Sequence, residues 1–144
     1  MHRLKYLTCG LALLAMACSN TPVTSPTTTP TTLTQDFTDA ANGPLTPNGS
    51  QTFTFAALAA GQVSVQLIAL NPDGPNGQVV GLSVGVSDSA GGCQSVVHND
   101  RATLTQAVVA TATTAGSLCA RIYDSTGTLP GPETFDIQVT TPGN

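Results

Sequence analysis

Leu118-Cys-Ala-Arg-Ile-Tyr123 is the stretch of sequence that decides the fold. Its Leu, Ala and Ile residues alternate with Cys, Arg and Tyr, so that every second side chain is apolar. A period of two is typical of a β-strand with one buried face, because successive side chains of a strand point to opposite sides. This stretch therefore predicts a strand that covers a hydrophobic core.

The same alternation recurs on both sides of that stretch. It is clear in four further runs, which are Phe53–Phe55, Val63–Leu67, Val80–Val86 and Phe135–Val139. Weaker strands are expected over 36–39, 94–98 and 102–110, and turn signals rich in Gly, Asn, Pro and Asp separate the runs. About seven to nine strands over residues 35–144 predict an all-β domain, namely a single antiparallel β-sandwich.

Two of the turn signals share one sequence pattern. Asp88-Ser-Ala-Gly91 and Asp124-Ser-Thr-Gly127 each follow an alternating run. An Asp side chain can accept hydrogen bonds from the backbone just after it, and Gly tolerates positive φ. We interpret the pattern as shared turn chemistry and expect each copy to close a hairpin.

The first seventeen residues have the features of a signal peptide. Arg3 and Lys5 precede an uncharged, mostly apolar run from Leu7 to Ala17, which is too short to cross a bilayer as a helix. The small residues before Cys18 resemble a bacterial lipobox, and this resemblance implies cleavage before Cys18 and a lipid on its thiol. An ordinary secretory signal cut after Ala17 is the alternative.

Residues 18–34 form the expected link between anchor and domain. Thr21–Thr34 consists almost wholly of Thr and Pro, which predicts an extended, disordered spacer without regular structure. At roughly 3 Å per residue it would hold a domain about 40 Å from the bilayer. Residue 19 is Ser and not Asp. By the sorting rule of enteric bacteria, this favours the outer membrane.

The charge distribution excludes several functions. All eight acidic residues lie beyond residue 17, but only Arg101 and Arg121 of the four basic residues do, which leaves a net charge of −6. Two arginines cannot supply the clustered cations that bind nucleic-acid phosphates. This part of the chain has no lysine, so it has no lysine Schiff base and no P-loop lysine. No cofactor is expected.

Two cysteines are left for the domain. Cys9 is removed with the signal peptide and Cys18 carries the lipid, so Cys93 and Cys119 are expected to form a disulfide in an oxidising compartment. Closing that loop would contribute about 3 kcal/mol in the chain-entropy model. A redox or metal site is the alternative, but no Cys-x-x-Cys motif or Cys/His cluster supports it.

The domain resembles the bacterial pre-peptidase C-terminal family. The motifs that carry the resemblance are Phe53-Thr-Phe55, Gly61-Gln-Val-Ser-Val65, Val80-Gly-Leu-Ser-Val-Gly-Val86, Gly91-Gly-Cys93, Gly116-Ser-Leu-Cys-Ala-Arg-Ile-Tyr-Asp124 and Phe135-Asp-Ile-Gln-Val-Thr140. They are chiefly core and turn positions, and the family often has an aromatic residue in place of Leu118. The resemblance implies a jelly-roll-like sandwich that serves as an accessory module, without catalytic residues of its own.

Two groups of polar residues are candidates for chemistry. His98-Asn99-Asp100-Arg101 is the densest group and is read as a candidate binding loop or, together with Ser95, as a hydrolase constellation. A solvated loop is the simpler reading, since a serine hydrolase needs a base and an oriented partner that neighbours along a loop rarely supply. Asn71–Gly77 offers oxygen ligands for Ca²⁺ but lacks EF-hand spacing, so a turn is favoured and no metal is expected.

These features favour a non-catalytic module displayed on a membrane through its lipid anchor. We expect it to bind a protein, a polymer or another envelope component. A passive structural or assembly lipoprotein is the second hypothesis, and a hydrolase is a distant third. The binding hypothesis predicts a contiguous exposed apolar or aromatic patch of several hundred Å², whereas the structural hypothesis predicts a uniformly polar Thr/Ser surface. The oligomeric state does not follow from the sequence.

Overall fold

Strands make up most of the molecule. The computed structural model describes residues 31–72 and 78–143, and this part contains eight strands and one short helix, α1 (Asp39–Asn42). The strands are β1 (Thr32–Thr38), β2 (Ser50–Ala57), β3 (Gly61–Asn71), β4 (Val80–Ser87), β5 (Cys93–Ala102), β6 (Ala107–Ala112), β7 (Gly116–Tyr123) and β8 (Thr134–Pro142).

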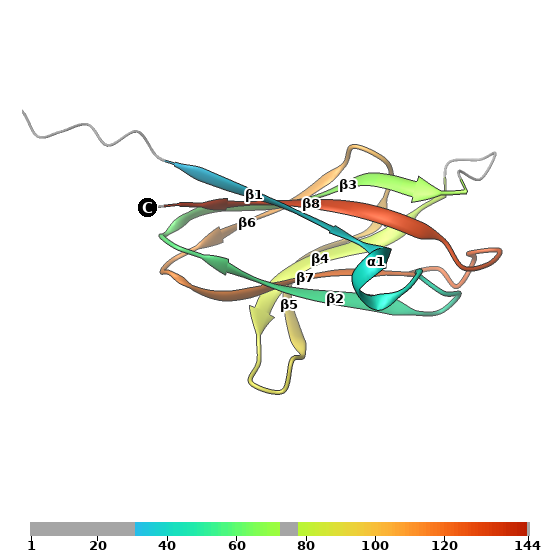
Figure 1. The fold of residues 1–144 in the computed structure, drawn as a ribbon, viewed down its shortest axis with the longest axis horizontal. Helices are drawn as coiled ribbons and strands as arrows, with labels where there is room; N and C mark the ends of the chain where they lie inside the picture. Colours follow the sequence, from blue (N-terminus) through green and yellow to red (C-terminus); the bar gives the residue numbers. More distant parts are fainter. Residues whose placement is uncertain (1–30, 73–77, 144) are drawn as a thin grey trace, which may run out of the picture.

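Two four-stranded antiparallel sheets pack face to face (Figure 1). One sheet has the order β1-β8-β3-β6, and the other has the order β2-β7-β4-β5. Strands far apart in the sequence are neighbours, since β1 pairs with β8 and β2 pairs with β7. This is the strand order of a jelly roll, in which the chain passes repeatedly from one sheet to the other and only β4 and β5 follow one another within a sheet. The expected all-β sandwich and its jelly-roll form are confirmed.

The core lies between the sheets and is built from the apolar side of each alternating strand. Ala120 and Ile122 of β7 are fully buried. All four phenylalanines of the chain cluster here: the ring centroids of Phe37 and Phe53 are 5.1 Å apart, and those of Phe53 and Phe135 are 5.9 Å apart. Tilted and edge-on geometries of this kind are favourable between aromatic rings. The stretch that decides the fold thus lies at the centre of the molecule.

The first strand begins earlier than the sequence indicates. β1 includes residues 32–34, which were assigned to the linker, and within it Thr32 pairs with Pro142 and Thr34 with Thr140. Threonine is a good strand former when a neighbouring strand satisfies its backbone. The partner strand β8 lies about a hundred residues away in the sequence, so the Thr-rich run gave no local sign of this pairing.

The expected strand over 102–110 is wrong in its first half. β5 ends at Ala102, and β6 begins only at Ala107. The turn between them contains Thr105 in the left-handed region, with a φ of 68°. The Gln106 N–H donates to the Thr103 carbonyl at 3.1 Å, which closes the turn. No Gly or Pro marks this turn, so the sequence carried no breaker signal there.

The two Asp-Ser-x-Gly motifs form similar turns in different places. Asp88 Oδ1 accepts from the N–H groups of Ala90 and Gly92, and this turn closes the β4–β5 hairpin as expected. Asp124 Oδ1 accepts in the same way from Gly127 at 2.9 Å. The second turn, however, connects β7 to β8 in the other sheet, so the expectation of a hairpin at Asp124 is wrong.

The expected disulfide between Cys93 and Cys119 is confirmed, with Cα atoms 5.7 Å apart. Other expectations concern residues outside the described part, namely the signal peptide over 1–17, Cys18 and the linker up to residue 30. Among residues 31–72 and 78–143, no helix has the length and apolar character that crossing a bilayer requires.

Candidate functional site

The predicted binding loop His98–Arg101 is wrong as a loop, because these residues lie within strand β5. β5 is the last strand of its sheet and carries two register irregularities against β4, one on each side of the Leu82–Val84 segment. Irregularities and charged residues are typical of exposed edge strands, since both discourage pairing with other chains. They also interrupt the alternation of side chains, which is why the segment looked like a loop.

The structure connects this polar group to strand β7. The Tyr123 hydroxyl donates to Asp100 Oδ1, and Asp100 Oδ2 lies 3.8 Å from His98 Nε2. The Arg121 guanidinium carbon lies 5.2 Å from the centroid of the Tyr123 ring, and its Nη2 donates to Ser50 Oγ at 3.0 Å. Sequence reasoning had not placed Tyr123 in this group, and it had expected an acid as the partner of Arg101 or Arg121.

Tyr123 is strongly affected by these surroundings. Burial, the hydrogen bond to Asp100 and the negative charge of that carboxylate raise the pKa of Tyr123 from 10.0 to about 12, and Arg121 opposes the shift. The hydroxyl is therefore a proton donor to Asp100 at neutral pH and not a base. Because this interaction occupies both groups, the network is suited to fixing β5 against β7.

The hydrolase constellation is not assembled. Within residues 31–72 and 78–143, no hydrogen bond joins Ser95 to His98, and the acid beside His98 is engaged by Tyr123. The candidate Ca²⁺ loop lies largely outside the described residues, with Asn71 as the last residue of β3. Among the described residues, no group of three or more His, Cys, Asp or Glu side chains is placed to hold a metal ion.

One carboxylate is buried away from this network. Glu133 is fully buried beside β8, and its backbone pairs with that of Leu45. In the described part of the chain, neither of its side-chain oxygens has a hydrogen-bond partner. An unpaired buried carboxylate is costly, so this side chain is a weak point of the core.

The small residues on the outer side of β4 allow side chains of β7 to reach β5. The positions of β4 that face away from the core hold only small residues, namely Gly81, Ser83 and Gly85, and all three are buried. Tyr123 lies opposite Gly81, and a Cβ atom on Gly81 would collide with its ring. Side chains of β7 therefore cross over β4 to β5.

The Cys93–Cys119 disulfide is a second link from β7 across β4 to β5, beside the Tyr123–Asp100 hydrogen bond. Cys119 of β7 lies opposite Gly85 of β4 and bonds to Cys93 at the start of β5. Cys119 is fully buried, whereas Cys93 is partly exposed. The bridge and the Tyr123–Asp100 hydrogen bond thus fasten the two ends of β5 to β7.

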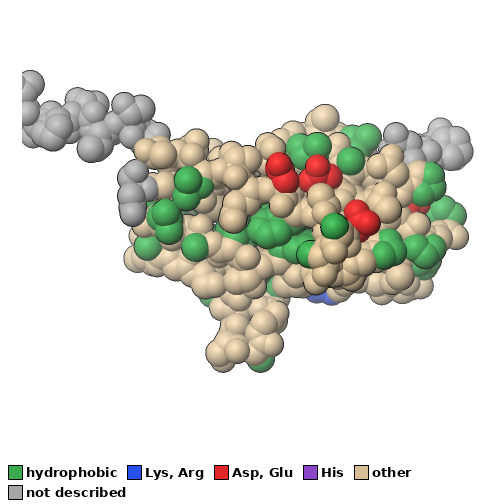
Figure 2. Space-filling model, viewed as in Figure 1, with side chains coloured by type: hydrophobic (Ala, Val, Ile, Leu, Met, Phe, Trp, Pro, Cys, Tyr) green, Lys and Arg blue, Asp and Glu red, His purple; other side chains and the backbone are tan. Residues whose placement is uncertain are grey.

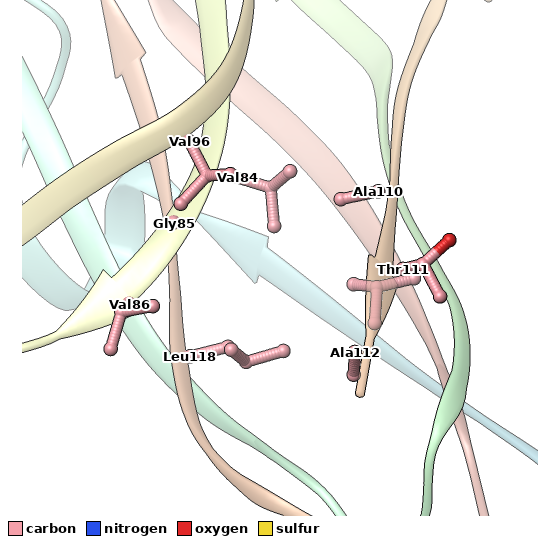
Figure 3. A pocket seen from close by; sticks show the side chains of 9 residues that line it. Val84, Gly85, Val86, Val96, Ala110, Thr111, Ala112 and Leu118 are labelled. Atoms are coloured by element: carbon pink, nitrogen blue, oxygen red, sulfur yellow. The ribbon is translucent and has the colours of Figure 1, made fainter. Parts of the chain in front are cut away.

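A hollow lies on the inner side of the same sheet, between the open edges of the sandwich. It has a volume of about 70 Å³, and we call it the edge hollow. Its lining comes from both sheets: Val63, Val84, Gly85, Val86, Val96, Ala110, Thr111, Ala112 and Leu118. Figure 3 shows Val84, Val96 and Leu118 on one side of the space and Ala110 and Ala112 on the other. All but one of the lining residues are apolar.

The rim of the edge hollow is exposed to solvent. Val96 is 64% exposed and Val86 is 49% exposed, which is unusual for large apolar side chains so close together. The consecutive valines Val96 and Val97 mark the irregularity of β5 and were the available signal for this site. That irregularity directs Val96 toward the hollow, while Val97 packs against the core.

The two strands that border the edge hollow differ in character. β5 has charged residues and irregular register, whereas β6, Ala-Val-Val-Ala-Thr-Ala, has no charged residue and no proline. β6 pairs with β3 on one side and is the last strand of its sheet. An edge of this kind offers free backbone groups to an incoming strand. Charged groups are sparse elsewhere too, as the mostly uncharged face in Figure 2 shows.

Models of known protein families do not match this chain, and a search of curated proteins finds no relative.

Proposed function

We propose that this protein is an exported lipoprotein, anchored through lipid on Cys18, that displays a non-catalytic jelly-roll module. The module binds an extended segment of an envelope protein along the edge formed by β5 and β6. The sequence resemblance to pre-peptidase C-terminal domains, which act as accessory modules, supports the same reading. The basic start, the short apolar run and the Cys after small residues support the anchor.

The edge hollow is the observation that carries the proposal. Its lining is apolar, its rim exposes Val86 and Val96, and it lies between the edges of two sheets. Burying such side chains against a partner removes apolar surface from water and is favourable by roughly 25 cal/mol per Å². The exposed valines of the rim are apolar surface that a passive, uniformly polar module would not need.

A protein segment is the occupant that fits this edge. β6 presents unpaired backbone N–H and C=O groups beside a hollow large enough for a small apolar side chain. Strand addition to a sheet edge uses both features, since backbone hydrogen bonds give affinity and side-chain pockets give specificity. β6 carries no charge, so it selects neither acidic nor basic segments.

A passive structural lipoprotein is favoured by one other observation. The outer face of the β1-β8-β3-β6 sheet is a polar array in which Thr34 lies opposite Thr140, and Thr140 lies opposite Ser64. This face resembles the uniformly polar surface expected for a passive role. The two candidates differ in what they predict for the edge hollow, because only the binding module needs Val96.

The anchor is tested by metabolic labelling with a fatty-acid probe. We expect the wild-type chain to be labelled and to fractionate with the outer membrane, and Cys18→Ser to abolish both properties. Labelling that persists in Cys18→Ser would show that the lipid, if any, is attached elsewhere.

Binding is tested by comparing two substitutions at exposed apolar side chains. Val96→Asp places a charge at the rim, whereas Leu33→Asp places the same charge at a leucine that is 39% exposed, on β1 at the opposite edge of the β1-β8-β3-β6 sheet. In native gels of detergent-solubilised membranes, we expect a complex that Val96→Asp abolishes and Leu33→Asp retains. A complex that tolerates both substitutions, or no complex in the wild type, contradicts the proposal.

A further inference from the structure

We propose that the Cys93–Cys119 disulfide controls the edge hollow, so that a dithiol reductant switches partner binding off. This inference rests on the proposed function of that site. It starts from the place of the bridge, which lies behind the wall of the hollow that β4 and β5 form.

The disulfide lies on the outer side of the sheet and the edge hollow on its inner side, next to the same residues. Gly85 lines the hollow and lies opposite Cys119, and Leu118, which also lines it, is the residue before Cys119. On the hairpin, Val86 lines the hollow and pairs with Gln94, the residue after Cys93. The wall is therefore made by the neighbours of both cysteines.

This end of the hairpin is held by its pairing with β4, by the hydrogen bonds of the Asp88 turn and by the disulfide. β5 is an edge strand whose sole sheet partner is β4, and their register is broken between Val84 and Gly85, next to the wall. The tip of the hairpin extends away from the body of the sandwich (Figure 1). The Tyr123–Asp100 hydrogen bond secures only the other end of β5. Besides the hairpin turn that joins β5 to β4, the disulfide is thus the covalent connection that ties this end of β5 to β7.

The packing around Gly85 makes the wall depend on close approach of the two strands. A Cβ atom on Gly85 would collide with the Gln94 carbonyl, so the backbones of β4 and β5 are in contact there. A docking surface that is held in its bound shape loses less entropy on binding than one that has to be ordered. Opening the bridge would release this contact, spread Val86 and Val96, and remove the preformed hollow.

The exposure of the two cysteines fixes the order of the exchange. A thiolate of the dithiol attacks the sulfur of Cys93, which is partly exposed, whereas Cys119 is fully buried. The S–S bond breaks, and Cys119 leaves as a thiolate that takes up a proton. The second thiol of the reagent then displaces Cys93 and forms a cyclic disulfide. Two electrons pass from the dithiol to the bridge.

Hydrogen exchange of the detergent-solubilised full chain tests, without any partner, whether the disulfide holds β5 in place. After reduction we expect the β5 amides near Val96 to exchange on the order of tenfold faster or more, while β3 and β8 keep their protection. The double variant Cys93→Ala, Cys119→Ala should behave like the reduced protein. Unchanged β5 exchange in both samples would overturn the inference, whatever the binding result.

Native gels of the same samples test the consequence for binding. We expect the Val96-dependent complex to disappear with the reductant and in the double variant. A complex that persists although β5 exchange has increased would overturn control by the disulfide and leave the proposed function intact. Absence of a Val96-dependent complex in the oxidised wild type would overturn the proposed function itself, together with its regulation.

Discussion

The pKa of Tyr123 is the most direct measure of the interaction between β7 and β5. Burial and the Asp100 carboxylate favour its neutral form, which raises its pKa to about 12. Since the folded-state pKa is above the ordinary value of 10.0, the stability that this interaction contributes is present below about pH 10 and is lost as the pH rises through about 12.

Removal of residues 1–17 leaves Tyr123 as the sole tyrosine, so tyrosinate absorbance of the processed chain reads its titration directly. We expect a midpoint near 12 and, in Asp100→Asn, a lower one, because that substitution removes the negative charge beside the hydroxyl. A midpoint near 10 in the wild type would mean that Tyr123 and Asp100 do not interact in solution.

Glu133 is a buried residue whose unpaired carboxylate destabilises the core. Its carboxylate is fully buried, with no hydrogen-bond partner in the described part. Replacing it by Met, of similar length, should raise the free energy of unfolding by about 1–3 kcal/mol, measured by denaturant titration. Glu133→Gln keeps unpaired polar atoms and should give a smaller gain. A loss of stability in Glu133→Met would show that the carboxylate has a stabilising ligand.

At the scale of elements, β4 is the strand on which its neighbours depend. Gly85 allows the β5 backbone to come into contact with it, and a Cβ atom there would meet the Gln94 carbonyl. Gly85→Ala should therefore destabilise the domain by roughly 1–3 kcal/mol, seen as a lower midpoint of thermal unfolding. Gly116→Ala is the matched control, because nothing lies within 4 Å of a Cβ atom there. Equal effects of the two substitutions would contradict the close packing at Gly85.

The elements also show how far the sequence leads. Regular alternation predicted β3, β4, β7 and β8, because their inward side chains are consistently apolar. It predicted only residues 94–98 of β5, because irregular register and an exposed edge interrupt the periodicity there. It failed at the start of β1, where pairing with a distant strand decides the structure. The sequence predicted the hydrogen bonding of the two Asp-Ser-x-Gly turns. Which strands these turns connect depends on the whole topology.

The candidate site, like the strands, could be predicted from the sequence only in part. The disulfide could be predicted, since the proposed signal peptide and lipid anchor left two cysteines for the domain and pairing them needs no knowledge of the fold. The edge hollow could not, because its lining comes from five strands, β3 to β7, that only the jelly-roll order brings together. The sequence directed attention to polar residues on β5, whereas the valines of that strand line the hollow.

At the scale of the whole molecule, composition and architecture support the proposed display module. The part beyond residue 17 has no lysine and a net charge of −6, and its charged groups form no metal cluster in the described residues. What distinguishes the surface is the apolar edge hollow beside the uncharged strand β6. We therefore propose that the protein acts through that edge and that the lipid anchor sets its location.

The most direct test is photo-crosslinking from single positions in the native envelope, since the chain beyond residue 17 has no lysine for amine-reactive reagents. With the crosslinking side chain at position 96, we predict one protein partner, crosslinked through a short extended segment. The same side chain at position 33, on β1 at the opposite edge of the β1-β8-β3-β6 sheet, should give no such product. No product from position 96, or the same products from both positions, would contradict the claim that the β5–β6 edge is the binding site.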